Sequence, residues 1–169
     1  METKHTISVL VENEFGVLAR IAGLFSSKGY NIDSLSVSET ADPTLSRMTI
    51  LTHGSDQIIE QIIKQLNKLV NVIKVEDLTK EKHFTQEMIL VKLKAGSKSE
   101  IQTQAEKLGA KILEAGSKAI VLRVVGDEDE IAHALDVLSS FGILELVRTG
   151  TIAIQRGEQT LLESTQKSS

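Results

Sequence analysis

The stretch "VENEFGVLARIAGLFSSKGYNI", residues 11–32, decides the fold. The residues that lead into it, "TISVLV" (6–11), alternate and are rich in β-branched side chains, which predicts a strand. Gly16 then opens a predicted helix, because apolar residues follow it at helical spacing. Gly29 stands where a helix C-terminus favours a left-handed residue. Two asparagines, Asn13 and Asn31, therefore flank one predicted helix.

The rest of the first half completes a β-α-β-β-α-β order. Two strands are predicted at "NIDSLSVSE" (31–39) and "LSRMTILTH" (45–53), joined by a turn that contains the single proline. "SDQIIEQIIKQLNKLV" (55–70) repeats Ile and Leu at helical spacing, and "NVIKVEDL" (71–78) is the last strand.

The same order recurs in the second half, after a polar segment. "TKEKHFTQ" (79–86) is expected to be a linker, because it is polar and charged. The predicted elements after it are a strand (87–95), a helix (97–109), a hairpin (110–126), a helix (127–142) and a final strand (143–157) with a break at Gly150. The halves share little sequence identity, so the repeat is one of architecture.

This pattern predicts an α+β protein with two ferredoxin-like βαββαβ sandwiches in tandem. We expect domains at 1–78 and 87–157, a linker at 79–86 and a flexible tail at 158–169. A unit of about 75–80 residues has little core and leaves one sheet face open, so association is expected. We predict a homodimer through the first domain.

Composition excludes several classes of function. The net charge is −4 with no basic cluster, which argues against nucleic acid as a partner. The absence of cysteine removes disulfides and thiolate chemistry. No apolar run approaches the roughly 20 residues of a membrane span, and a predicted strand begins too early for a signal peptide. A cytoplasmic protein without a membrane association is therefore expected.

The strand-to-helix turn is the candidate binding site. The first amides of a helix favour an anion, and Gly16 allows a ligand to approach the backbone closely. The Asn13 amide both donates and accepts, which suits a zwitterion. Asn31 lies about 20 Å away, so it reaches the same pocket only from a neighbouring chain across a two-fold axis. Ordinary turn chemistry explains the same residues without a ligand.

No catalytic or metal-binding constellation stands out. The four histidines are scattered singly, without the spacing of metal ligands. The "DEDE" run at 127–130 is interpreted as a helix N-terminus. No serine lies in a nucleophile elbow. Arg47 and Arg148 lie in predicted strands, as interface ion pairs or on a solvated face.

Two segments carry a family resemblance. "ENEFGVLARIAGLFSSKGYNIDSLSVSETADPTLSRMTI" (12–50) resembles the ACT domain of the regulatory subunits of acetolactate synthase (acetohydroxyacid synthase), and "RTGTIAIQRG" (148–157) resembles the closing strand of that family's C-terminal domain. The resemblance implies a non-catalytic subunit that binds and activates a large catalytic subunit. It also implies feedback inhibition by valine or another branched-chain amino acid, and leaves open which one. Thiamine diphosphate, Mg²⁺ and FAD are then expected on the catalytic partner and not on this chain.

The resemblance also implies an effector site at a dimer interface. The matching positions are Asn13, Gly16, Val17 and Leu18 in the strand-to-helix turn, and Asn31 and Ile32 from the facing chain. Phe15 departs from family members with Ser or Pro before the glycine, which leaves the choice of effector open. The second half lacks an equivalent turn around Gly96, so we expect no amino acid site there and a docking or dimer-supporting role instead.

Two other functions remain as alternatives. A free-standing ACT-type amino acid sensor would bind its ligand without a large partner, although the chain shows no helix-turn-helix or basic face for DNA contact. A small enzyme would need a catalytic constellation that the sequence does not display.

Overall fold

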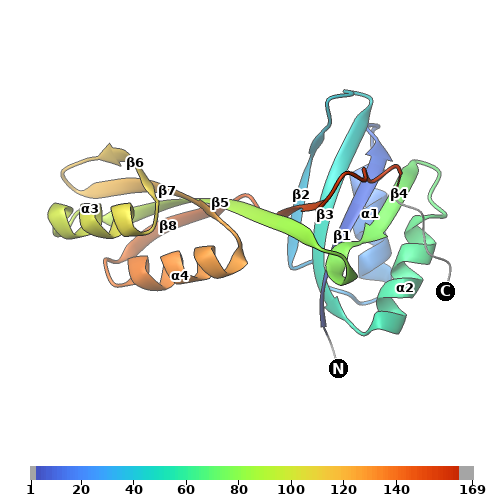
Figure 1. The fold of residues 1–169 in the computed structure, drawn as a ribbon, viewed down its shortest axis with the longest axis horizontal. Helices are drawn as coiled ribbons and strands as arrows, with labels where there is room; N and C mark the ends of the chain where they lie inside the picture. The colour runs from blue at the N-terminus through green and yellow to red at the C-terminus, as the bar shows by residue number, and fades with distance from the viewer. Residues whose placement is uncertain (1–2, 164–169) are drawn as a thin grey trace. The chain divides into compact units, whose positions relative to one another are not determined.

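The computed structural model describes residues 3–163, which form two units. The first contains the described residues up to Phe84 together with those from Thr151 onward, and the second is Thr85–Gly150 (Figure 1). The chain therefore leaves the first unit, builds the second, and returns to the first. No helix among the described residues has the length and apolar character that a membrane span requires.

The first unit is an antiparallel sheet covered on one face by two helices. Its elements are β1 (Thr3–Glu12), α1 (Val17–Ser27), β2 (Ser34–Glu39), β3 (Leu45–Gly54), α2 (Asp56–Leu66) and β4 (Val72–Asp77), followed by the 3₁₀ turn η1 (Leu78–Lys80). The strand order is β2-β3-β1-β4, with both central strands contributing to the core. Figure 1 shows α1 and α2 side by side against this sheet.

The core of the first unit lies between the sheet and the two helices. Alternate residues of β1 face inward, because the side chains of a strand point to opposite faces in turn. The fully buried members of this core include Ile7, Val9, Val11, Ile21, Phe25, Met48, Ile50, Ile59, Ile62 and Leu66. The apolar spacing that predicted both helices therefore identifies the faces that they bury.

The opposite face of this sheet is covered by the end of the chain. The strand β9 (Ile152–Gln155) crosses it, and the Ala153 amide donates a hydrogen bond to Thr49 Oγ1 at 3.3 Å. The Thr151 amide donates to Ser34 Oγ at 3.0 Å. Ser8 on β1 is 0% exposed as a result. The polar outer face, which sequence reasoning left open to a partner, is thus partly closed by the chain itself.

The domain boundaries of the structure differ from the expected ones. The strand β5 (His83–Lys94) begins inside the segment expected to be a linker (79–86). The expected final strand divides into β8 (Ile143–Arg148) and β9, because Gly150 turns the chain with a φ of 80°. The segment from Thr151 then joins the first unit and not the expected second domain, 87–157.

The expected flexible tail, 158–169, also differs over its described part. Leu161 is 8% exposed, and the Thr160 amide and hydroxyl both donate to the Glu163 carboxylate. These hydrogen bonds lower the pKa of Glu163. Residues 164–169 lie outside the described part of the chain. Apolar periodicity could not show this packing, because the segment is too short to display a repeat.

The second unit repeats the architecture of the first. Its remaining elements are α3 (Lys98–Lys107), β6 (Lys111–Ala115), β7 (Ala119–Gly126) and α4 (Glu128–Ser139), with the strand order β6-β7-β5-β8. Its core contains Ile89, Val91, Leu93, Ile101, Ile120, Leu122, Ile131 and Leu138. The predicted fold class, α+β with two ferredoxin-like βαββαβ sandwiches, is confirmed.

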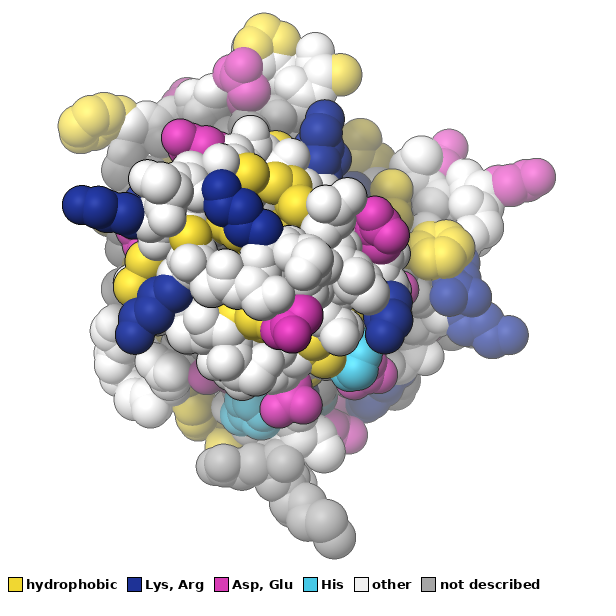
Figure 2. All heavy atoms as spheres, turned by 90° about the vertical axis from the view of Figure 1, so that its left-hand side faces the viewer, with side chains coloured by type: hydrophobic (Ala, Val, Ile, Leu, Met, Phe, Trp, Pro, Cys, Tyr) yellow, Lys and Arg dark blue, Asp and Glu magenta, His cyan; other side chains and the backbone are white. Residues whose placement is uncertain are grey.

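Charged residues of the second unit serve local structure. Asp127 and Glu130 form a capping box at the start of α4, which confirms the interpretation of the "DEDE" run as a helix N-terminus. Figure 2 shows one face of this unit, where Lys and Arg side chains are interspersed with Asp and Glu.

Candidate functional site

The N-terminus of α1 is opened by glycine and has no side-chain cap. Gly16 is the N-cap residue with a φ of 81°, and the first turn of the helix holds no acidic residue. Val17 is buried in the core and fixes the turn, whereas Leu18 is 42% exposed. The first amides of a helix have no intrahelical acceptor. The Val17 amide donates to the Glu14 carbonyl at 3.4 Å, so the donors of this turn are the amides that follow it, beside a positive helix end and an apolar side chain.

Asn13 is held beside the same turn by the loop between β2 and β3. Its side-chain amide donates to the Pro43 carbonyl at 2.9 Å, and its backbone amide donates to the Thr44 carbonyl at 2.7 Å. The loop is itself braced, because the Thr44 hydroxyl and amide donate to the Asp42 carboxylate and lower the pKa of Asp42. Asn13 is thus exposed on a fixed backbone.

Asn31 and Ile32 follow the other end of α1. The carbonyl of Asn31 accepts a hydrogen bond from the Thr52 hydroxyl at 2.6 Å, and its side-chain amide donates to Asp33 at 3.1 Å. Ile32 is half-buried against the core of the first unit. The second carboxylate oxygen of Asp33 contacts the His53 ring. These hydrogen bonds hold Asn31 in place, and its exposed side chain is accessible to a neighbouring molecule.

The structure brings four of the six predicted residues together. Asn13, Gly16, Val17 and Leu18 share the turn before α1, whereas Asn31 and Ile32 lie beyond its far end. The 11 residues of α1 rise roughly 16 Å between these two groups. One chain alone does not enclose a pocket with all six, and the shared site between two chains stays a prediction.

Sequence reasoning missed a polar network that braces the turn. Arg20 Nη1 donates to Asn71 Oδ1 at 2.6 Å, and the Asn71 amide donates to Glu12 at 2.8 Å and to Glu14 at 3.0 Å. Asn71 is 9% exposed and precedes β4, the strand that pairs with β1. No local spacing signals this network, because Arg20 and Asn71 are 51 residues apart in the sequence.

The second unit has a different turn at the corresponding place. Ser97, and not a glycine, is the N-cap of α3, and Gly96 has no positive φ. The left-handed glycine that opens α1 at Gly16 therefore has no counterpart at the start of α3.

The conformation of Gly16 leads to a prediction with a control on the same helix. Gly16→Ala is expected to destabilise the protein by about 1–2 kcal/mol, because an L-residue at this φ is strained even though nothing lies within 4 Å of the added Cβ. Gly23→Ala, inside α1 with equally open space, is expected to stabilise by about 0.5–1 kcal/mol. Urea unfolding of both variants measures the difference, and a shared sign would contradict the assignment of strain to Gly16.

Comparisons with known proteins agree over both units. A family model described as the acetohydroxyacid synthase small subunit-like ACT domain matches residues 7–74, and one for the small subunit of acetolactate synthase matches residues 86–157. A probable acetolactate synthase small subunit of Archaeoglobus fulgidus is 44% identical over 158 residues, which are 92% of this chain and 99% of the relative.

Further relatives support the same assignment. The acetolactate synthase small subunit of Haemophilus influenzae is 41% identical over 94% of this chain and 99% of its own. The crystal structure of the Thermotoga maritima acetolactate synthase small subunit superimposes with a TM-score of 0.86 at 34% identity, covering 93% of this chain and 99% of that one. The fold, the turn before α1 and these matches lead to one conclusion: the chain belongs to the family of acetolactate synthase small subunits.

Proposed function

We propose that this chain is the regulatory, non-catalytic subunit of acetolactate synthase. It binds the large catalytic subunit, raises its activity, and confers feedback inhibition by valine or another branched-chain amino acid. The observation that carries the proposal is the uncapped, glycine-opened N-terminus of α1 in a chain of the small-subunit family. The reaction and its cofactors, thiamine diphosphate, Mg²⁺ and FAD, are assigned to the catalytic partner.

The proposed effector site has a polar and an apolar side. The effector carboxylate accepts hydrogen bonds from the first amides of α1, where the helix dipole adds about 0.3–1 kcal/mol. Leu18, which is 42% exposed, and Ile32 of the facing chain line the aliphatic side chain of the effector. Asn13 of the same chain and Asn31 of the facing chain hold the polar groups. This arrangement requires a homodimer through the first unit, whose edge strand β2 exposes Val37.

Inhibition in this scheme results from an equilibrium between two dimer arrangements. An effector that bridges two first units favours the arrangement in which its site is complete. One arrangement supports activation and the other does not. The effector shifts the equilibrium between them only as far as its affinities for the two arrangements differ. A residue that contacts the effector alone should therefore affect inhibition without affecting activation.

Calorimetric titration with valine, leucine, isoleucine and threonine tests the site. We expect saturable binding of a branched-chain amino acid at about one per chain, and its loss in Asn31→Ala, because the variant removes the amide that completes the pocket. Asn67→Ala is the matched control, since Asn67 is an exposed asparagine at the end of α2. Equal binding by Asn31→Ala and the parent chain would contradict the shared site.

A further inference from the structure

The side-chain amides of Asn13 and Asn31 are each fixed in one orientation by a partner that only accepts hydrogen bonds. Asn13 Nδ2 donates to the Pro43 carbonyl at 2.9 Å, and Asn31 Nδ2 donates to Asp33 Oδ1 at 3.1 Å. A carbonyl or an ionised carboxylate has no proton to donate, so neither amide can flip without losing its hydrogen bond. Both residues are exposed, and both therefore present Oδ1, an acceptor, to a ligand.

Asp33 decides the orientation of Asn31 from a backbone that is tied to β3. The Asp33 amide donates to the Leu51 carbonyl at 2.8 Å, and the Asn31 carbonyl accepts from the Thr52 hydroxyl at 2.6 Å. These two hydrogen bonds hold the main chain of residues 31–33 at both ends. The contact with Asp33 Oδ1 then determines which atom of the Asn31 side chain faces outward.

His53 fixes the carboxylate of Asp33 in turn. Its Nδ1 contacts Asp33 Oδ2, and because a carboxylate only accepts, the hydrogen of this contact lies on the ring nitrogen. The two oxygens of Asp33 are therefore shared between Asn31 and His53. The Asp33 side chain is 33% exposed, so its carboxylate is open to a ligand as well as to these two partners. A negative charge thus lies beside the acceptor that Asn31 presents.

The N-terminus of α1 offers the opposite chemistry. Its first turn has no acidic residue and no side-chain cap, and the amides that follow Val17 are donors. An amino acid has a carboxylate that needs donors and an ammonium that needs acceptors. In a site shared between two chains, α1 supplies the donors and residues 31–33 of the facing chain supply an acceptor with a negative charge beside it.

We propose that Asp33 is a positioning residue that makes the effector site selective for the ammonium group of an amino acid. It directs Asn31 Oδ1 to the ammonium and adds a charge that attracts this group, so a ligand without an ammonium gains nothing from this half of the site. The proposal rests on the proposed function, because it requires that Asn31 contacts an effector held by a facing chain. It adds Asp33, supported by His53, to the six positions of that site.

Two pairs of ligands test this selectivity. Valine and leucine are each compared with the same molecule without its ammonium, isovalerate and isocaproate, by calorimetric titration of the full chain at constant ionic strength. We expect the amino acid that binds to do so at least about tenfold more tightly than its analogue. Asp33→Ala should weaken amino acid binding by about tenfold, and should not weaken binding of the analogue, which makes no contact with this half of the site. Asp33→Glu keeps the carboxylate and should retain part of the preference.

The NMR signals of the asparagine side chains check the positioning itself. In Asp33→Ala the NH₂ signals of Asn31 should move, because Nδ2 loses its acceptor, whereas those of Asn13 should not. Asp136→Ala, at an exposed position on α4, is the control and should alter neither these signals nor binding.

The outcomes separate this proposal from the proposed function. If the parent chain binds valine or leucine but Asp33→Ala leaves the preference over the analogue unchanged, or leaves the Asn31 signals in place, the role of Asp33 is overturned and the effector site stands. If the parent chain binds none of the four ligands, the effector site and the role of Asp33 are overturned together.

Discussion

Replacing Phe25 by alanine is expected to destabilise the protein by about 3–5 kcal/mol, because it removes a large side chain from a close-packed core. Phe25 is 1% exposed on α1 and is among the largest fully buried residues. It packs between the helices and the sheet with residues such as Ile21 and Ile59. Denaturant unfolding, followed by circular dichroism, measures the loss.

Phe15 provides the matched control for this prediction. It lies one residue before Gly16 and is fully exposed, at 104%. Phe15→Ala is therefore expected to change stability by less than about 0.5 kcal/mol. A loss comparable to that of Phe25→Ala would contradict the exposed position of this side chain. A normal stability combined with altered effector choice would instead place Phe15 at the rim of the effector site.

Replacing Arg148 by alanine is expected to destabilise the second unit by about 2–3 kcal/mol, because it leaves a buried carboxylate without its partner. Arg148 Nε and Nη2 each donate to one oxygen of Glu87 at 2.7 Å. The Glu87 side chain is 5% exposed, and its hydrogen bonds raise the pKa of Arg148. The expected loss is less than that of a fully buried pair, since the Arg148 side chain is 49% exposed and water can replace it.

A double-mutant cycle separates this pair from general effects of losing an arginine. Adding Glu87→Gln to Arg148→Ala should recover part of the stability, because it removes the unpaired charge. Arg123→Ala, at an exposed position on β7, should cost less than about 0.5 kcal/mol. If Arg148→Ala proves as mild as Arg123→Ala, the bidentate pair does not stabilise the second unit.

The strands and helices of the first unit could be predicted because each buries one regular face. Alternation in β1 and helical spacing in α1 and α2 mark these faces directly in the sequence. The return of the chain at Gly150 could not be predicted in the same way. The break was visible, but the four residues of β9 carry too little pattern to show which sheet they join. Their neighbours, Ser34 and Thr49, are more than a hundred residues away.

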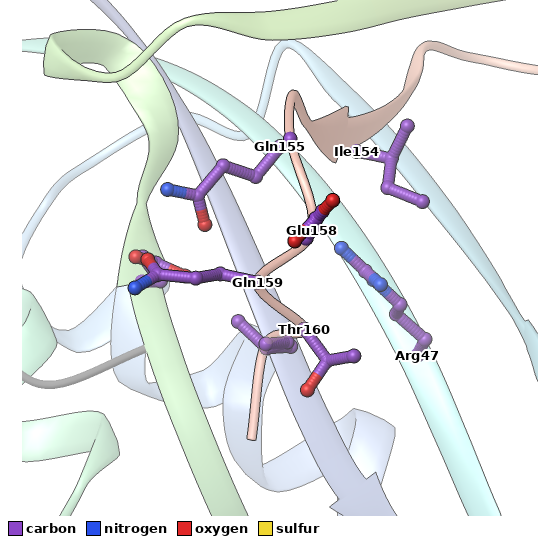
Figure 3. Close-up of a pocket in the computed structure, with 9 residues that line it drawn as sticks. Arg47, Ile154, Gln155, Glu158, Gln159 and Thr160 are labelled. Atoms are coloured by element: carbon purple, nitrogen blue, oxygen red, sulfur yellow. The ribbon is translucent and has the colours of Figure 1, made fainter. Parts of the chain in front are cut away.

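The candidate site was predictable in part, for a similar reason. Gly16 and Asn13 are local to one turn, and their relation follows from sequence spacing. The contacts that hold the turn come from elsewhere in the chain, such as Pro43 for Asn13 and Asn71 for Arg20. The pocket beside Arg47, on the outer face of the first unit's sheet, was missed. Sequence reasoning placed Arg47 at an interface or on a solvated face. In the structure it lies under a segment that sequence reasoning had assigned to the second domain (Figure 3).

The most direct test of the regulatory role is an activity assay of the catalytic subunit with and without this chain. The account predicts that the chain alone forms no acetolactate, that it raises the activity of the catalytic subunit, and that a branched-chain amino acid then inhibits the complex. Asn31→Ala should activate equally and confer no inhibition. A chain that binds the amino acid but never changes the activity of the catalytic subunit would contradict the account and favour a free-standing sensor.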